Sequence, residues 1–348
     1  MSKAFNRVDH NILIEDLYNM KCPAWLLKTI FSFLSNRVLI FTYQGQHSTP
    51  KSLPGGAPQG TLLGVIFFIV KFNSALLRPN MIRHLSFQNG STKAKYMDDV
   101  SLAASVNLWD KDNRIADIQE QLNELEVFVN RNKMKINFSK SKMMKFTRSS
   151  KEFLDILSFS DGKNLEEIDH AKLLGLIISS DLKWDLNTDY MCQKARSKIY
   201  LLRSMKNCGL NLNELVDAYK KEVRSLLELA VPVWSSGITQ EQSLKIERVQ
   251  KSSLAAILGQ QYTSYNEALA LTKLEKLETR RTKICLRFTT KNVKSANCLF
   301  TFVNKKHNTR SNEGLLQEFQ CRKNAFYQSG LPYLARLYNA NFKQKCEK

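Results

Sequence analysis

The sequence has 348 residues, of which 43% are hydrophobic and 24% charged, and this balance excludes a disordered chain and predicts a folded protein of two or three domains. Its 52 Lys and Arg residues outnumber its 32 Asp and Glu residues. The resulting formal net charge of +20 makes a polyanion such as nucleic acid the expected partner. A surface kept basic for solubility is the alternative.

The cysteines indicate reduced thiols rather than a disulfide framework or a zinc site. There are seven of them, scattered and never spaced as Cys-x-x-Cys. The longest apolar run, residues 62–70, has nine residues, whereas about 20 are needed to cross a bilayer. No basic-then-apolar leader is visible. We therefore expect an intracellular protein of the nucleus or cytoplasm, not secreted and without a membrane partner.

The first part of the chain predicts two helices and two strands. Asp9 is placed to cap a helix, because apolar residues then recur at helical spacing: Ile12, Leu13, Leu17 and Met20. Pro23 is expected to start a second helix. Residues 38–43 are β-branched and aromatic and predict a strand, which a second short strand should follow before the glycine pair at residues 55–56.

A glycine-rich stretch, Gly-Gly-Ala-Pro-Gln-Gly-Thr-Leu-Leu-Gly, occupies residues 55–64. Glycines let the backbone approach a ligand closely. Pro58, Gln59 and Gly60 are expected to open a helix that carries the apolar run to Val70. A simple helix-start turn is compatible with the same residues.

Two adjacent carboxylates, Asp98 and Asp99, lie between residues 93–96 and 100–106, which both predict short strands. The pair is therefore expected at a hairpin tip. Two hard cations held by carboxylate oxygens are what an in-line attack on a phosphoryl group requires. An ordinary solvated turn is the alternative for an isolated Asp-Asp pair.

The rest of the chain is mostly helical in pattern. Residues 115–129 predict an amphipathic helix without assigned chemistry. Residues 131–151 hold eight basic residues and no acidic one, which indicates a basic strand, either solvated or binding an anion. Near residue 175, a glycine between apolar β-type residues permits close approach by a nucleic acid or by another strand. Helices are expected from residue 187, beginning with basic positions: Lys194, Arg196, Lys198, Arg203 and Lys206.

Three of these blocks, in their order and spacing, resemble the reverse transcriptases of non-LTR (LINE-type) retrotransposons. Residues 2–10 resemble the family's first motif, Asp-Leu-Ser-Lys-Ala-Phe-Asp-Arg-Val-Asp-His. Residues 55–64 resemble its Gly-Val-Pro-Gln-Gly-Ser-Val-Leu-Gly motif, and residues 96–99 resemble its Tyr-Ala-Asp-Asp box. Less specific resemblance extends to residue 337.

The resemblance implies an α+β fold of the right-hand polymerase type. Its palm would be an antiparallel sheet with packed helices, and a mostly helical thumb and C-terminal region would follow. The expected division is a partial palm at residues 1–150, a primer-grip-like hairpin at 151–186, a helical thumb at 187–260 and a basic helical region at 261–348.

The resemblance also implies RNA-directed DNA synthesis. Mg²⁺, or Mn²⁺, held by Asp98 and Asp99 would support addition of deoxynucleotides to a DNA primer or duplex on an RNA template. Lys140 lies in the block Asn-Phe-Ser-Lys-Ser-Lys, similar to the family's Asn-x-x-Lys-Thr-Lys, and would act as a catalytic residue facing the nucleotide phosphates.

Other residues are expected around the nucleotide and the primer. Phe5 would lie beneath the sugar and exclude a ribose 2′-hydroxyl, the alternative being a core phenylalanine. The residues expected against the nucleotide and template are Pro58, Gln59, Gly60, Tyr96 and Met97. Leu174 and Gly175 resemble part of the Tyr-Leu-Gly hairpin that holds the primer end.

The first motif departs from the family pattern. Met1 stands where the residue after the leading aspartate is expected, and Asn6 replaces the second aspartate with a poorer cation ligand. We therefore expect a chain truncated within this motif, lacking the fingers and impaired in catalysis, with Asp9 as a conceivable substitute ligand. Whether the chain is an active enzyme stays open, as does its oligomeric state. A catalytically inactive RNA- and DNA-binding remnant is the alternative.

Overall fold

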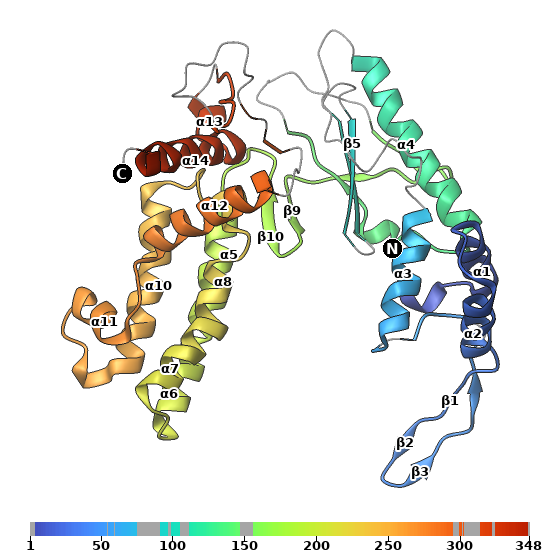
Figure 1. Cartoon of the computed structure of the whole chain (residues 1–348), viewed down its shortest axis with the longest axis horizontal. Coiled ribbons are helices and arrows are strands. Elements are labelled where there is room, and N and C mark those ends of the chain that lie inside the picture. Colours follow the sequence, from blue (N-terminus) through green and yellow to red (C-terminus); the bar gives the residue numbers. More distant parts are fainter. Residues whose placement is uncertain are drawn as a thin grey trace. The chain divides into compact units, whose positions relative to one another are not determined.

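The computed structural model describes residues 4–53, 55–58, 60–74, 91–96, 99–104, 111–146, 156–294, 299–300, 302, 314–321 and 324–346. The chain divides into two compact units (Figure 1). Unit 1 comprises Met1–Met143 and Lys151–Glu167, and unit 2 comprises Met144–Ser150 and Ile168–Lys348. The boundary between residues 167 and 168 lies inside the range expected for a separate hairpin domain. Helices and strands occur together, which agrees with the α+β expectation at that coarse level.

Three helices form the first part of unit 1: α1 (His10–Asn19), α2 (Ala24–Leu34) and α3 (Leu62–Ser74), preceded by the 3-10 turn η1 (Ala4–Arg7). The predicted cap of α1 is confirmed, because the Oδ1 atom of Asp9 accepts hydrogen bonds from the backbone N–H groups of Asn11 and Ile12, each 3.1 Å long. Helix α1 packs on both α2 and α3. Their apolar sides form a small core of Val8, Leu13, Leu17, Ile30, Leu34, Ala57 and Phe67.

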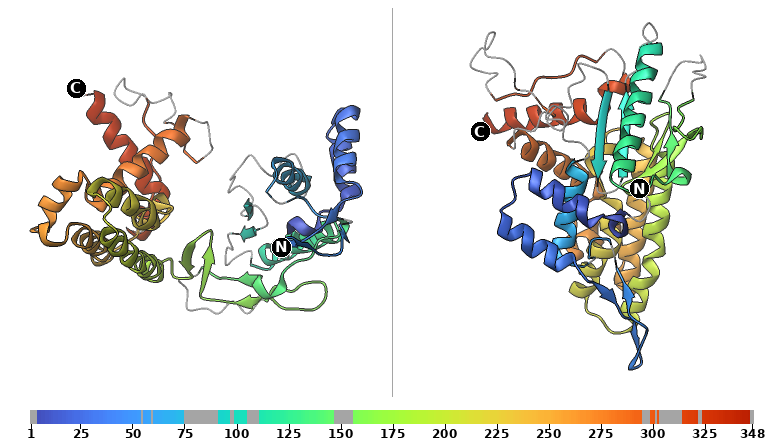
Figure 2. Two further views of the ribbon diagram at one scale, coloured as in Figure 1. Left: turned by 90° about the horizontal axis from the view of Figure 1, so that it is seen from below. Right: turned by 90° about the vertical axis from the view of Figure 1, so that its right-hand side faces the viewer.

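A narrow β arm joins α2 to α3 and projects beyond the end of α2 (Figure 2). It contains four two-residue strands: β1 (Val38–Leu39), β2 (Thr42–Tyr43), β3 (Gln46–His47) and β4 (Lys51–Ser52). Strand β1 pairs with β4 and β2 with β3, both antiparallel. The single strand expected at residues 38–43 is therefore wrong in detail, since Ile40 and Phe41 interrupt it. At the interruption, the Phe41 N–H donates to the hydroxyl of Ser48 at 2.9 Å.

The second part of unit 1 holds the hairpin β5 (Ser91–Tyr96) and β6 (Asp99–Ala104), then α4 (Lys111–Arg131), the 3-10 turn η3 (Phe138–Lys140), β7 (Lys142–Met143) and β8 (Glu166–Glu167). Strand β6 packs on α4. Strands β7 and β8 pair in parallel, and every named strand of the described residues pairs with one other strand. The antiparallel palm sheet expected in residues 1–150 thus appears, within the described part, as separate two-stranded ladders.

Unit 2 begins with the hairpin of β9 (His170–Leu173) and β10 (Leu176–Ser179) and continues as helices. The helices of at least eight residues are α5 (Asp185–Ser197), α6 (Ile199–Asn207), α7 (Leu212–Tyr219), α10 (Gln240–Leu258), α11 (Tyr265–Thr272), α12 (Leu277–Lys294) and α14 (Gly330–Cys346). Shorter turns are η4 (Lys220–Arg224, a π-helix), α8 (Ser225–Leu227), α9 (Val231–Trp234), η5 (Gly259–Gln261) and α13 (Asn324–Tyr327). The predicted change to helix near residue 187 is confirmed.

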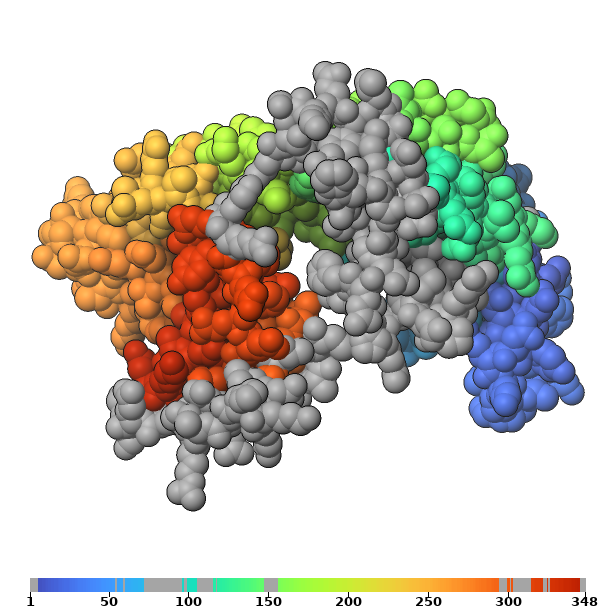
Figure 3. Space-filling view, turned by 90° about the horizontal axis from the view of Figure 1, so that it is seen from above, coloured from blue at the N-terminus to red at the C-terminus, as the bar shows by residue number. Residues whose placement is uncertain are grey.

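A single apolar core holds the helices of unit 2 together. Its most buried members include Leu202, Tyr219, Leu227, Trp234, Ile246, Leu254 and Leu277. Helix α14 packs against α12, and the two are seen in contact in red and orange in the space-filling view (Figure 3). Among the helices of the described residues, none combines the length and the apolar content needed to cross a bilayer.

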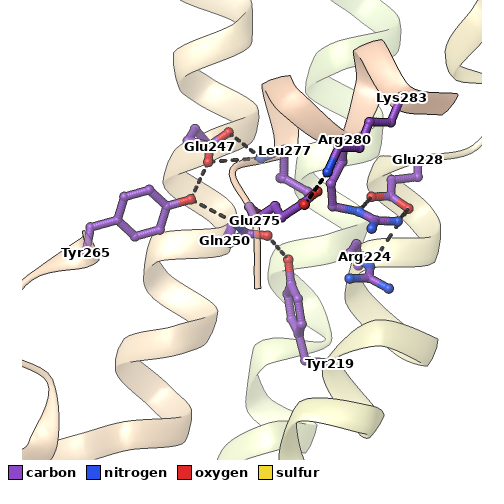
Figure 4. A network of polar contacts seen from close by, with 10 residues as sticks. All are labelled: Tyr219, Arg224, Glu228, Glu247, Gln250, Tyr265, Glu275, Leu277, Arg280 and Lys283. Carbon is purple, nitrogen blue, oxygen red and sulfur yellow. Dashed lines mark hydrogen bonds and ion pairs between the residues drawn. The ribbon is translucent and has the colours of Figure 1, made fainter. Parts of the chain in front are cut away.

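A polar network lies inside this helical core (Figure 4). The Tyr219 hydroxyl donates to the Oε1 atom of Gln250 at 2.5 Å, and Gln250 Nε2 donates to the Tyr265 hydroxyl at 2.8 Å. Tyr265 in turn donates to Glu247, whose carboxylate accepts from the N–H of Leu277 at 3.2 Å. Burial raises the pKa of Tyr219, and burial together with Glu247 raises that of Tyr265. The network therefore joins α7, α10, α11 and the start of α12.

Candidate active site

The Tyr-Met-Asp-Asp stretch lies at the turn between β5 and β6. Tyr96 is the last residue of β5 and pairs with Asp99, the first residue of β6, so that a two-residue loop connects the strands. The predicted hairpin is confirmed. Both Tyr96 and Asp99 are exposed. Met97 and Asp98, which follow Tyr96 in the sequence, lie outside the described residues.

The chemistry of this turn suits a hard divalent cation. Asp98 and Asp99 are consecutive carboxylates, and carboxylate oxygens are the ligands that Mg²⁺ and Mn²⁺ prefer. Within the described ranges, no three His, Cys, Asp or Glu side chains gather into a metal-binding group. Of the two carboxylates, the described part contains Asp99, and their role as cation ligands stays a prediction.

The glycine-rich loop is attached to the segment that resembles the first motif. The N–H of Gly56 donates to the carbonyl of Val8 at 2.8 Å, and the Nε2 atom of His10 lies 2.9 Å from the carbonyl oxygen of Gly56. Gly56 has a φ of +96°, and a Cβ there would lie 3.3 Å from the backbone of Asn6. The two motifs therefore meet through a backbone hydrogen bond at Val8 and through the His10 side chain, which is 46 residues from Gly56.

The predicted helix opening after the loop is confirmed by the start of α3 at Leu62. The Thr61 hydroxyl donates to the carbonyl of Pro58 at 2.9 Å and accepts from the N–H of Gly64 at 3.0 Å. Pro58 is buried, whereas Gly60 is exposed with a φ of +79° and has open space at its α-carbon. Gln59 lies outside the described residues. Thr61 thus fixes the loop to the first turn of α3.

Asp9 has protein partners for both carboxylate oxygens. Oδ1 caps α1, and Oδ2 lies 2.7 Å from the ammonium group of Lys133. Partial burial would raise the pKa of Asp9, but the hydrogen bond from Lys133 and those from the backbone of Ile12 and Asn11 outweigh it and hold the pKa below its ordinary value. The observed contacts are those of a helix cap and an ion pair rather than of a free metal ligand.

A buried ion pair lies beside this segment and was not anticipated from the sequence. Lys71 of α3 has a fully buried side chain, and its ammonium lies 3.0 Å from a carboxylate oxygen of Asp16 on α1. Burial lowers the pKa of Lys71, against the opposite effect of Asp16. Asp16 and Lys71 are 55 residues apart, and Lys71 ends an apolar run, so local pattern gives no signal for their pairing.

Lys140 lies on the 3-10 turn η3 and not on the basic strand expected across residues 131–151. The N–H groups of Lys140 and Ser141 both donate to the carbonyl of Asn137, which closes this turn. The Lys140 side chain is exposed, and within the described part no hydrogen bond or ion pair joins it to Asp99, Tyr96 or Pro58. Phe5 lies on η1, and its side chain is outside the described residues. The roles of Lys140 and Phe5 stay predictions.

Leu174 and Gly175 form the turn of the β9–β10 hairpin in unit 2, with φ values of +48° and +90°. The predicted hairpin is confirmed. The φ of Gly175 favours glycine, and a Cβ there would lie 2.9 Å from the Cδ2 atom of Leu229, so the Leu229 side chain would have to shift. The Leu174 side chain is half exposed. The primer-holding role of this turn stays a prediction.

The family described as "Reverse transcriptase (RNA-dependent DNA polymerase)" matches residues 1–178, which is half of the chain. The chain belongs to this family, and the motif-based resemblance to retrotransposon enzymes is confirmed by its relatives. It is 26% identical over 238 residues to "Probable RNA-directed DNA polymerase from transposon BS" of Drosophila melanogaster, covering 68% of this chain and 25% of the relative.

A second relative is "RNA-directed DNA polymerase from mobile element jockey" of Drosophila funebris. It is 26% identical over 265 residues, which covers 74% of this chain and 28% of the relative. The chain therefore spans about a quarter of the length of these two proteins.

Proposed function

We propose that this chain carries the RNA-directed DNA polymerase activity of a retrotransposon, adding deoxynucleotides to a primer on an RNA template. The observation that carries the proposal is the pairing of Tyr96 with Asp99, which puts the Tyr-Met-Asp-Asp stretch at a tight hairpin within the residues that match the family. An intracellular site of action, in the nucleus or cytoplasm, belongs to the same proposal, as do an RNA template, a DNA primer and deoxynucleotides as partners.

In this proposal Asp98 and Asp99 hold Mg²⁺ or Mn²⁺. Such an ion, when bound, supplies Lewis-acid stabilisation of the charge that develops on the transferred phosphoryl group. The protein contributes by positioning: Pro58, Gln59 and Gly60 lie against the template–nucleotide pair. The contacts of the loop with Val8 and His10 support this role, because they fix the loop to the first motif segment.

The remaining site residues have proposed roles that follow the family. Phe5 lies beneath the nucleotide sugar and excludes a 2′-hydroxyl, while Tyr96 and Met97 lie beside the nucleotide. Lys140 faces the phosphates and donates a proton to the departing pyrophosphate, which its exposure permits. Leu174 and Gly175 hold the primer end.

The proposed domain roles are a palm at residues 1–150, a primer-grip hairpin at 151–186, a thumb at 187–260 and a basic helical region at 261–348. The hairpin at β9 and β10 and the helices that follow from α5 support the middle two assignments. The many basic side chains of the helices suit a phosphate backbone.

The test is primer extension on an RNA template with Mg²⁺ or Mn²⁺, comparing the chain with Asp98→Ala and Asp99→Ala. We expect each substitution to reduce extension by roughly three orders of magnitude or more, because several kcal/mol of charge stabilisation is lost. Asp161→Ala is the matched control, since Asp161 is an exposed turn aspartate of unit 1. Extension that survives Asp98→Ala contradicts the proposal.

A second arm of this experiment compares the chain with a version that carries an aspartate in an added N-terminal extension. If both versions are silent while nucleic acid still binds, the inactive RNA- and DNA-binding remnant becomes the better description.

A further inference from the structure

Two lysines of unit 2 meet at one tyrosine on the surface beside the β9–β10 hairpin. Lys172 of β9 donates a hydrogen bond to the Tyr190 hydroxyl at 2.6 Å, and its ammonium lies 4.9 Å from the centre of the Tyr190 ring. The ammonium of Lys194, one turn further along α5, also lies 4.9 Å from the same ring centre. Three side chains from two elements therefore converge.

The cluster has an excess of positive charge that no acidic side chain of the described residues compensates. No ion pair of the described part involves Lys172 or Lys194, whereas the neighbouring Asp189 on α5 pairs with Lys245. Hydrogen bonding to Lys172 and then to Lys194 lowers the pKa of the Tyr190 hydroxyl. Two ammonium groups held at one ring repel each other, so an anion between them is favourable.

The backbone beneath the cluster is fixed. Lys172 pairs across the hairpin with Ile177, whose N–H donates to the Oδ1 atom of Asn187 on α5 at 3.1 Å. Asn187 is buried and precedes Tyr190 by one helical turn. Because this bond attaches the hairpin to α5, Lys172 is held in position relative to Tyr190 and Lys194. A preorganised pair of cations binds an anion with less loss of side-chain entropy.

We propose that Lys172, Tyr190 and Lys194 form a binding site for a phosphate group of a nucleic-acid backbone. This site is separate from the Leu174–Gly175 turn. It rests on the proposed function, because its ligand is a polynucleotide. Its mode is backbone contact rather than base stacking, because two ammonium groups already lie at the tyrosine ring. Binding at this site is therefore independent of base sequence.

The test measures binding of the full chain to a fluorescent RNA–DNA duplex over a series of salt concentrations. Each neutralised phosphate contributes about 0.9 to the slope of log affinity against log salt. The double variant Lys172→Gln/Lys194→Gln removes this one phosphate contact, so it should lower that slope by about 0.9 and weaken binding by roughly tenfold at about 0.1 M salt. Tyr190→Phe keeps both charges and should leave the slope unchanged.

The matched control is Lys163→Gln/Lys251→Gln. It removes the same charge from two lysines that each lie over a single aromatic ring, Phe138 at 4.6 Å and Tyr265 at 5.1 Å. The proposal is overturned if this control and the Lys172/Lys194 variant reduce the slope equally. Thermal melting of every variant, all changed at surface positions, shows whether the fold is retained.

Two further outcomes separate this proposal from the proposed function. If the unchanged chain binds no duplex and no single strand, both are wrong. If inorganic phosphate alone binds at Lys172 and Lys194 while the duplex slope does not depend on them, the site takes a free phosphate and the backbone assignment is overturned, but the polymerase proposal stands. Slope reduction confined to the Lys172/Lys194 variant supports the site.

Discussion

The carbonyl group of Pro58 lies against the α-carbon of Gly64, in the space that a side chain at residue 64 would occupy. A Cβ there would also be 2.9 Å from the carbonyl carbon of Pro58. We predict that Gly64→Ala displaces the loop that ends at Gly60 and destabilises the chain by about 1–3 kcal/mol, the usual cost of overpacking. Urea denaturation measures the loss, and the apparent Km for deoxynucleotide in primer extension should rise.

The control for Gly64 is Gly330→Ala. Gly330 starts α14, and a Cβ there would meet the carbonyl oxygen of Pro232 at an ordinary 3.4 Å. Because alanine is the better helix former, Gly330→Ala should be neutral or stabilising by up to about 1 kcal/mol. Equal destabilisation by both alanines would show that Pro58 is not the cause.

The ion pair of Asp9 with Lys133 predicts how the free energy of unfolding changes at acidic pH. The folded pKa of Asp9 is lowered, so its ionised form stabilises the fold fully above the ordinary value of 3.8, and that contribution is lost as pH falls through the lower folded value. Asp9→Asn keeps a capping oxygen but removes the charge. Its destabilisation, measured by urea denaturation, should be at most about 1 kcal/mol near pH 7 and should shrink below pH 3.8.

Combining Asp9→Asn with Lys133→Gln gives a double-mutant cycle for this ion pair. The effect of Asp9→Asn should be smaller in the Lys133→Gln background than in the original chain, since the two side chains interact directly at 2.7 Å. Additive effects at pH 7 would contradict the assignment.

The buried pair of Lys71 and Asp16 predicts a strong coupling. Lys71→Met removes a fully buried ammonium that lies 3.0 Å from a carboxylate oxygen of Asp16 and should cost about 3–5 kcal/mol, the usual cost of breaking a buried ion pair. Adding Asp16→Asn should recover part of that loss, and chemical denaturation of the four members of the cycle measures it. If the double variant loses as much free energy of unfolding as the two single variants together, the pair does not interact.

The hydroxyl of Tyr219 is predicted to stabilise unit 2 through Gln250. Tyr219→Phe removes the donor to a buried amide oxygen and should cost about 1–3 kcal/mol. Tyr200→Phe is the control, because Tyr200 on α6 is 75% exposed. Loss of this exposed hydroxyl should change the free energy of unfolding by no more than about 0.5 kcal/mol. Urea denaturation followed by tryptophan fluorescence measures the loss, since one of the four tryptophans, Trp234, lies in the same core.

The contacts of Tyr190 with two lysines predict how its hydroxyl pKa changes when either lysine is replaced. Lys172 and Lys194 favour the tyrosinate, so Tyr190 should ionise below the ordinary value of 10.0. Lys172→Gln should move the pKa upward toward 10.0, and Lys194→Gln should do so to a smaller extent. The measurement is tyrosinate absorbance against pH, with Tyr190→Phe subtracted. If the pKa of Tyr190 rises in neither variant, the contacts with the two lysines are contradicted.

The sequence pattern predicted those elements that depend on interactions between residues close in the sequence. The cap at Asp9, the start of α3 after Gly60 and the hairpin at residues 96–99 follow from short-range signals of capping, glycine conformation and strand propensity. The hairpin at residues 174–175 was expected from the family resemblance instead. The β arm was predicted less well, because a hydrogen bond from Phe41 to Ser48 across the arm decides where its ladder is interrupted. Likewise, Asn137 bends the chain into a turn at Lys140 despite the strand-like basic run.

The surroundings of the candidate site could not be predicted, since they depend on contacts between distant residues. Asp9 meets Lys133 from 124 residues away, and His10 meets Gly56 from 46 residues away. Motif matching identifies Asp9 as a candidate ligand, but only the structure shows that its oxygens have other partners. The two lysines at Tyr190 come from a strand and a helix, and no spacing rule links Lys172 to Lys194.

The contact between Glu247 and Leu277 has a consequence for the order of folding. Helix α12 begins after Lys276, whose side chain has no hydrogen-bond acceptor. The N–H of Leu277, the first residue of α12, donates instead to Glu247 on α10, 30 residues earlier. We therefore expect α12 to fray as an isolated peptide and to become stable only after α10 is folded. During synthesis α10 emerges before α12, so we expect the Glu247 contact to form only once both segments have left the ribosome.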